Sequence, residues 1–205
     1  VEEPMDTVFE CEAVHEYLPI KRVIGQVERM SHQQDFLHEV RRNGWEAALA
    51  LDLYTPIEAI DPESWEELDA VMLLGVEAGA QEQTFNPTVF HKLKELRQAH
   101  PKAASLPVIV DGGVKLTNIN KLAQEGIQAA CVGSALWKSE QPSATLDEFF
   151  AIVEKARWRV RKNSLWWERT KSLSLIVPAQ MKKQIKIPEV KVHCGIKYVA
   201  LFGSA

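Results

Sequence analysis

The stretch "VIVDGGVKLTN" (residues 108–118) starts as an apolar run, ends that run on Asp111, and places Gly112 and Gly113 before a helical pattern. A short, nearly continuous apolar run is typical of a strand that is covered on both faces. Glycine accepts positive φ without steric cost, so the two glycines favour a sharp turn after the strand. The turn does not require the aspartate, which indicates a separate role for this carboxylate.

Four further units of the same kind occur along the chain. A strand followed by a helix, repeated roughly every 25 residues, predicts a parallel sheet with helical crossovers. We expect strands at 22–28, 47–53, 70–76, 107–111 and 129–134, helices at 34–44, 86–100, 118–126 and 145–160, and a broken helical stretch at 55–68.

The composition is that of an ordinary globular protein. Of the 205 residues, 46% are hydrophobic and 25% charged, and the formal net charge of −4 argues against nucleic acid as a general partner. We see neither a run long enough to cross a membrane nor a secretory signal. Cys11, Cys131 and Cys194 are widely separated and odd in number, which favours a reducing, cytoplasmic location.

The expected strand ends carry polar residues. Functional groups of parallel α/β sheets gather at the carboxyl ends of the strands, and four of the five ends here have a carboxylate: Glu28, Asp52, Glu77 and Asp111. A cap or turn role explains any one of them equally well. Backbone N–H groups exposed at "DGG" (111–113) and "GS" (133–134) would suit an anion such as a phosphate.

These motifs resemble the ribulose-phosphate 3-epimerase family, whose members are (β/α)8 barrels of the pentose phosphate pathway. The matching stretches are "LDLYTP" (51–56), "LDAVMLLGVEAGAQEQTF" (68–85), "VDGGVKLTNINKLAQEG" (110–126) and "VGSALW" (132–137). Their order follows the family's fifth to eighth strands. The expected fold is therefore α/β, a TIM barrel of the ribulose-phosphate-binding type present as about five βα units. An open doubly wound sheet is the alternative.

The resemblance implies a reaction and a set of residues. The family moves a proton on and off C3 of a ketopentose phosphate, with one aspartate on each face of the substrate and a divalent metal ion at the enediolate. Asp111 would be one acid/base and a metal ligand. The phosphate of ribulose 5-phosphate or xylulose 5-phosphate would bind at Gly79, Gly112, Gly113, Gly133 and Ser134.

The sequence departs from the family in several places. Stretches that match the second and third strands, which carry the other aspartate and two histidine ligands, are missing. Gln26 stands where the family usually has histidine, and the phosphate loop "EAGAQE" (77–82) keeps only Gly79 and adds Glu77 and Glu82. We expect no epimerase activity from these residues alone. The alternative function is a non-catalytic barrel remnant that binds a sugar phosphate or a protein partner.

The chain divides into the epimerase-like part, residues 1–160, and a basic tail, residues 161–205. We expect the tail to cover the barrel edge with a final helix and its tryptophans, a role favoured over single-stranded nucleic-acid binding. Its end, "GIKYVALFGSA" (195–205), resembles the start of a nucleotidyltransferase domain. Five strands alone would leave two unpaired sheet edges, so we expect a fragment that aggregates, pairs with a second copy or remains loosely folded.

Overall fold

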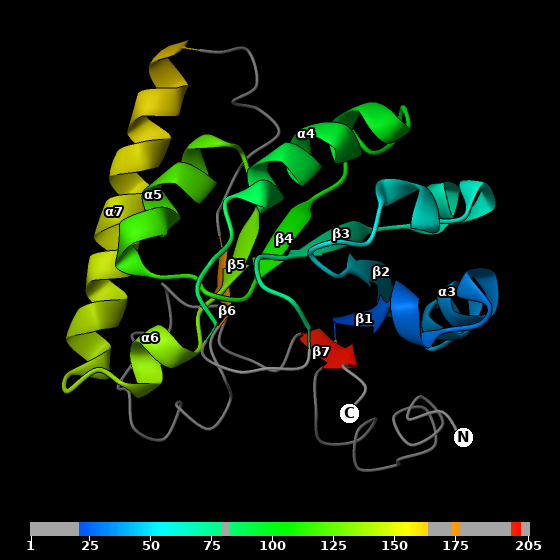
Figure 1. Cartoon of the computed structure of the whole chain (residues 1–205), viewed down its shortest axis with the longest axis horizontal. Coiled ribbons are helices and arrows are strands. Elements are labelled where there is room, and N and C mark those ends of the chain that lie inside the picture. The colour runs from blue at the N-terminus through cyan, green and yellow to red at the C-terminus, as the bar shows by residue number, and fades with distance from the viewer. Residues whose placement is uncertain (1–20, 79–82, 164–173, 177–197, 202–205) are drawn as a thin grey trace.

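The computed structural model describes residues 21–78, 83–163, 174–176 and 198–201 (Figure 1). Its sheet is parallel throughout, and the five expected strands pair in the order in which they follow in the chain. They are β1 (Arg22–Gln26), β2 (Glu46–Leu51), β3 (Ala70–Leu74), β4 (Val108–Asp111) and β5 (Ala129–Cys131). The α/β prediction is confirmed, with strands that end two or three residues earlier than expected, except β4, which ends at Asp111 as expected.

The helices follow the strands as the sequence predicts. The four expected helices are α3 (Gln33–Arg42), α4 (Thr88–Ala99), α5 (Leu116–Gln124) and α7 (Pro142–Asn163), and a short helix that was not expected, α6 (Ser134–Trp137), precedes α7. The broken stretch after β2 consists of two 3-10 turns, η2 (Ile57–Ala59) and η3 (Pro62–Glu67), and a third, η1 (Val27–Arg29), follows β1. At the start of α4 the Asn86 side-chain oxygen accepts from the Thr88 N–H at 3.0 Å.

The two faces of the sheet differ in what covers them. One apolar cluster joins alternate strand residues, such as Val23, Leu49 and Val110, to buried residues of all five helices. The cluster on the opposite face holds strand residues, with Ala78 as the one addition, and no residue of a described helix. Figure 1 shows α3, α4, α5 and α7 following one another around the outside of the sheet. Helices on one face only are typical of a barrel wall and not of a doubly wound sheet.

Both edges of the five-stranded sheet are paired, which corrects the expectation of two unpaired edges. Strand β6 (Ser174–Ile176) adds in parallel to β5, and β7 (Tyr198–Leu201) adds in parallel to β1. The tail thus supplies strands where a helix alone was expected, and α7 continues to Asn163. Trp166 and Trp167 lie outside the described residues, as does most of 195–205 beyond β7.

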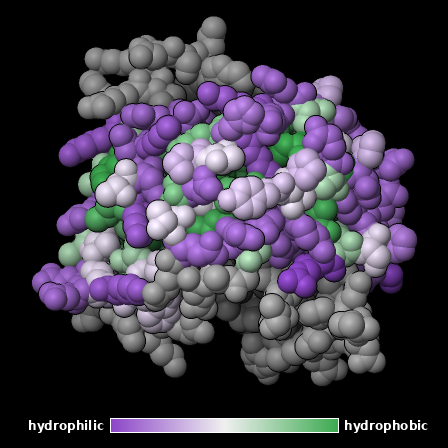
Figure 2. Space-filling model, viewed as in Figure 1, coloured by the Kyte–Doolittle hydropathy of each residue, from purple (hydrophilic) through white to green (hydrophobic). Residues whose placement is uncertain are grey.

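The face of the molecule that Figure 2 shows is mainly polar where it is coloured. Figure 2 shows hydrophilic residues over most of the visible face, with hydrophobic ones in small separate areas between them. Among the described residues, the large hydrophobic side chains with high exposure are Tyr54 and Trp137. In the same part of the chain, no helix has the length and apolar character needed to cross a bilayer.

Candidate functional site

The carboxyl ends of β1 to β5 form one rim of the sheet, and side-chain alternation decides which residues face its helix-free side. Ile24, Ala50, Ile109 and Ala129 belong to the cluster on that side. Two positions further along the chain are Gln26, Asp52, Asp111 and Cys131. Successive side chains of a strand point to opposite faces, so these four polar residues share the helix-free side at the rim.

Asp111 is a rim carboxylate whose pKa is shifted by burial. Burial raises its pKa above the ordinary value of 3.8, while a hydrogen bond from the Gly112 main chain opposes the shift. Its own carbonyl oxygen accepts from the Gly75 N–H at 2.6 Å, which ties the end of β4 to the end of β3. A carboxylate with raised pKa binds protons more strongly, which suits a general base.

Cys131 lies beside Asp111. The register of β4 and β5 pairs Val110 with Ala130, so the next residues along both strands, Asp111 and Cys131, are neighbours. Burial raises the pKa of the Cys131 thiol well above its usual value, and the nearby Asp111 charge adds to the shift. The thiol therefore stays protonated, as in a small packing residue and unlike a reactive nucleophile.

The two glycines after Asp111 have a packing reason for their identity. Gly112 and Gly113 have φ values of 97° and 66°. A Cβ on Gly112 would lie 2.5 Å from the Val76 side chain, and one on Gly113 would lie 2.6 Å from the main-chain nitrogen of Phe85. The turn after β4 thus packs directly on the segments that follow β3, and Asn118 holds it by donating to the Gly113 oxygen at 3.0 Å.

The remaining expected phosphate residues have different surroundings. Gly133 and Ser134 lie at the start of α6, and a Cβ on Gly133 would meet no atom within 4 Å. Open space at Gly133 is compatible with a ligand beside the main chain. Gly79 lies outside the described residues.

The residues of this rim do not fit the metal site that the family resemblance implies. Asp111 is the one expected ligand, and the described part of the chain contains no group of three His, Cys, Asp or Glu side chains able to hold a metal ion. The described histidines lie on or beside α3 and α4, away from the strand ends: His32, His38, His91 and His100. Gln26, where the family usually has histidine, offers a neutral amide.

A hydrogen-bonded network at the ends of β1, β2 and β3 was not predicted. The Glu28 carboxylate accepts from the Asp52 N–H at 2.8 Å. The Asp52 oxygen Oδ1 in turn accepts from the N–H groups of Leu53 at 2.7 Å and Ala78 at 2.9 Å. The only signal in the sequence was the carboxylate at each of these strand ends, which did not indicate its partner.

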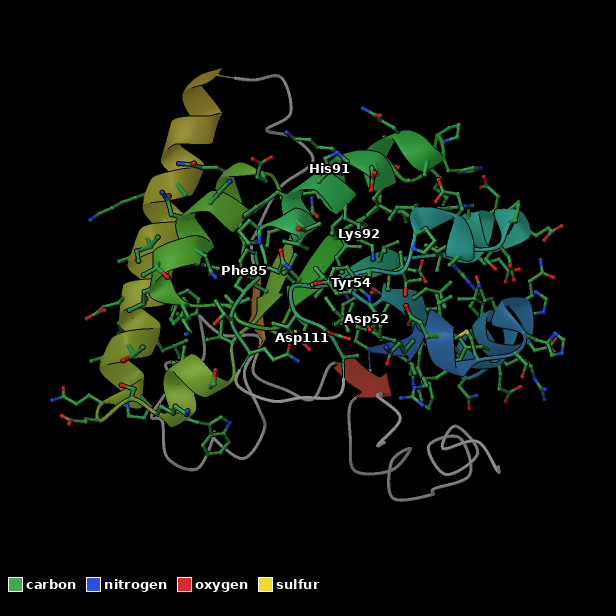
Figure 3. The ribbon with its side chains drawn as sticks, in the orientation of Figure 1. Asp52, Tyr54, Phe85, His91, Lys92 and Asp111 are labelled. Carbon is green, nitrogen blue, oxygen red and sulfur yellow. The ribbon has the colours of Figure 1, made fainter. Side chains whose placement is uncertain are left out.

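Lys92 supports the same strand end from α4. Its side chain is buried, and Nζ donates to the main-chain oxygens of Asp52 and, at 3.4 Å, Leu53. In Figure 3 it extends from α4 toward Asp52. Burial lowers the pKa of Lys92 to about 8, although Glu28, Asp52 and Glu95 oppose the shift. The sequence did not predict that Lys92 belongs to this site, because a lysine in an amphipathic helix is usually an exposed surface residue.

The lowered pKa makes a prediction about stability. Between pH 8 and 10.5 the unfolded chain keeps the Lys92 proton and the folded chain loses it, so the free energy of unfolding should rise with pH across this window. Compared with Lys92→Met, the wild type should gain on the order of 1–3 kcal/mol. Urea unfolding at a series of pH values measures the difference. Lys94→Met, an exposed change on the same helix, is the control and should show no such trend.

The chain matches proteins of known family over more than half of its length. The ribulose-phosphate 3-epimerase family model matches residues 8–137. The chain is 33% identical over 129 residues to ribulose-phosphate 3-epimerase of Buchnera aphidicola from Acyrthosiphon pisum, covering 62% of the chain and 56% of that protein. For the Escherichia coli K12 enzyme the identity is 30%, covering 62% of the chain and 57% of the enzyme.

A more distant relative has the same extent of match. The ribulose-phosphate 3-epimerase of Schizosaccharomyces pombe is 29% identical over 63% of the chain and 55% of its own length. The chain thus spans a little over half the length of the curated relatives that it matches. The family model covers more than half of the chain, and the matched region contains β1 to β5 and the whole rim. This chain belongs to the ribulose-phosphate 3-epimerase family.

Proposed function

We propose that the protein binds a ketopentose 5-phosphate at the carboxyl ends of β1 to β5 and that Asp111 exchanges the proton on C3 of this sugar. Ribulose 5-phosphate and xylulose 5-phosphate are the substrates that family membership supports. The observation that carries the proposal is the Asp111 carboxyl group, whose pKa burial raises at the end of β4. The open space at Gly133, on the neighbouring strand end, would accept the phosphate beside the main chain.

The proposed reaction requires a single proton transfer, from C3 of the sugar to the Asp111 carboxylate. The C3–H bond lies next to the C2 carbonyl, so when the carboxylate takes the proton, the electron pair moves to the C2 oxygen and forms an enediolate. Return of a proton to the same face of C3 restores the starting sugar. The raised pKa of Asp111 brings its proton affinity closer to neutrality, which favours this transfer.

Inversion at C3 requires a second acid on the opposite face of the sugar. Asp52 shares the helix-free side of the rim, but its Oδ1 already accepts from two main-chain N–H groups. We therefore expect exchange of the C3 proton by this chain without net epimerisation. The second candidate is binding without chemistry, which the amide of Gln26 and the incomplete ligand set favour.

Proton NMR of ribulose 5-phosphate in D2O separates these possibilities. Loss of the C3–H signal in the presence of the protein, and not with Asp111→Asn, supports the proposed exchange. Calorimetric titration with the same sugar phosphate, with and without added Mn²⁺, measures binding. Binding without exchange would favour the non-catalytic candidate, and the absence of binding in both titrations would contradict both candidates.

A further inference from the structure

The Asp52 carboxylate joins the carboxyl ends of two neighbouring strands, β2 and β3. Asp52 follows β2 directly, and its Oδ1 accepts from the Ala78 N–H, 26 positions away, just beyond the end of β3. Ala78 is also the residue at which the segment after β3 meets the cluster on the helix-free side of the sheet. The carboxylate thus fixes main chain at the rim itself.

Asp52 is in turn held from two sides. The Glu28 carboxylate, after β1, accepts from the Asp52 main-chain N–H at 2.8 Å, and Lys92 on α4 donates to the Asp52 main-chain oxygen. A side chain whose own main chain is held in this way can fix its partner more tightly than one on a free loop. The chain of contacts runs from β1 through β2 to β3 across three neighbouring strand ends.

The other side of the same segment is also held. The side-chain amide nitrogen of Gln83 donates to the main-chain oxygen of Glu77 at 2.5 Å. This bond brings together the residues before and after 79–82. Phe85, two residues further, packs on Gly113 at the turn after Asp111. The position of Ala78 is therefore coupled through described contacts to the turn that follows the proposed base.

From these contacts we infer that Asp52 is a positioning residue: it holds Ala78 in the place that the rim needs for sugar-phosphate binding, without itself taking the C3 proton. The inference rests on the proposed function, since it assigns Asp52 a role at the same site. The negative charge is not required for this role. An acceptor oxygen in the same position is sufficient, and asparagine provides one.

The chain offers a matched control at the opposite end of the same two strands. Asp69, just before β3, accepts from the Ala47 N–H of β2 at 2.9 Å through Oδ2. This bond resembles the Asp52–Ala78 bond in length and type and lies far from the rim, at the amino end of the sheet. Loss of either bond should destabilise the fold, but only loss of the Asp52 bond should affect the rim.

The experiment compares Asp52→Ala, Asp52→Asn and Asp69→Ala with the wild type in the full chain. The first readout is amide hydrogen exchange without ligand: Asp52→Ala should remove the protection of the Ala78 amide, and the other two variants should keep it. The second is calorimetric titration with ribulose 5-phosphate: Asp52→Ala should weaken binding by about 10- to 100-fold, and Asp52→Asn should restore it to near the wild-type value.

The outcomes separate this inference from the proposed function. If the wild type does not bind ribulose 5-phosphate, the proposed function is wrong and the binding role of Asp52 falls with it. If the wild type binds and Asp52→Ala binds equally well, or if Asp69→Ala weakens binding as much, the inference alone is wrong. Unchanged protection of Ala78 in Asp52→Ala would also overturn it, because the bond would then not hold the residue.

Discussion

Replacing Asp111 by asparagine should lower the rate of C3 proton exchange by at least about 100-fold, because removal of a positioned general base typically loses 10²- to 10⁴-fold in rate. Asparagine has nearly the same shape and keeps an acceptor for the Gly112 main chain, so the turn after β4 should persist. Exchange of the C3 proton in D2O, followed by NMR at saturating ribulose 5-phosphate, measures the effect. An exchange rate equal to that of the wild type would exclude Asp111 as the base.

The same substitution should stabilise the fold. Burial raises the pKa of Asp111, so at pH values just above 3.8 the folded chain holds a proton that the unfolded chain has lost. The stability of the wild type therefore falls as pH rises through this window, and the deficit remains at neutral pH. Asp111→Asn lacks the buried charge and should be more stable near pH 7 by about 0.5–2 kcal/mol, the range of common stabilising single substitutions.

Urea unfolding of both proteins between pH 4 and pH 8 tests this sign. The difference in the free energy of unfolding should grow with pH and then level off. Asp147→Asn, an exposed change on α7, is the control and should alter neither stability nor exchange. A variant that is less stable than the wild type at neutral pH would mean that the Asp111 charge is well compensated in the folded chain.

The sequence predicted the strands and the rim because local patterns determine them. The apolar runs are buried strands, and the alternation that buries Ile109 also places Asp111 on the helix-free side. Pro56 and Pro62 broke the helical pattern after β2, and the structure has two 3-10 turns there. Each of these features depends on residues that are close together in the sequence.

Contacts between distant residues could not be predicted in the same way. The Asp52–Ala78 bond joins residues 26 positions apart, and the Lys92–Asp52 bond joins residues 40 apart. Asp52 reads as a turn residue and Lys92 as a surface charge until the sheet and α4 are brought together. The pairing of the two sheet edges also depends on distant residues, because β7 comes from the end of the chain and pairs with β1, and β6 pairs with β5 across the whole of α7.

Gly112 and Gly113 were assigned to a phosphate, but their surroundings give a second explanation that can be tested. At Gly113 the main chain has a φ of 66° and lies against Phe85, where a Cβ would be 2.6 Å from the nitrogen and 2.7 Å from Cα. Main-chain atoms cannot move aside as a flexible side chain does. Gly44 has a similar φ of 76°, but a Cβ there would meet nothing within 4 Å. Gly44 and Gly113 thus share a left-handed backbone conformation, but only Gly113 has main-chain atoms of another residue close to it.

Gly44→Ala should therefore lower the free energy of unfolding by only about 1–2 kcal/mol, the penalty for a left-handed conformation of a residue with a Cβ. Gly113→Ala should lower the free energy of unfolding by the same amount and by about 1–3 kcal/mol more, because its Cβ would overlap with Phe85 and overpacking typically costs this much. Urea unfolding of the two variants and the wild type without ligand measures both terms. If both variants lose the same stability, close packing does not explain the glycine at 113, and a ligand-binding role of its main chain becomes the better explanation.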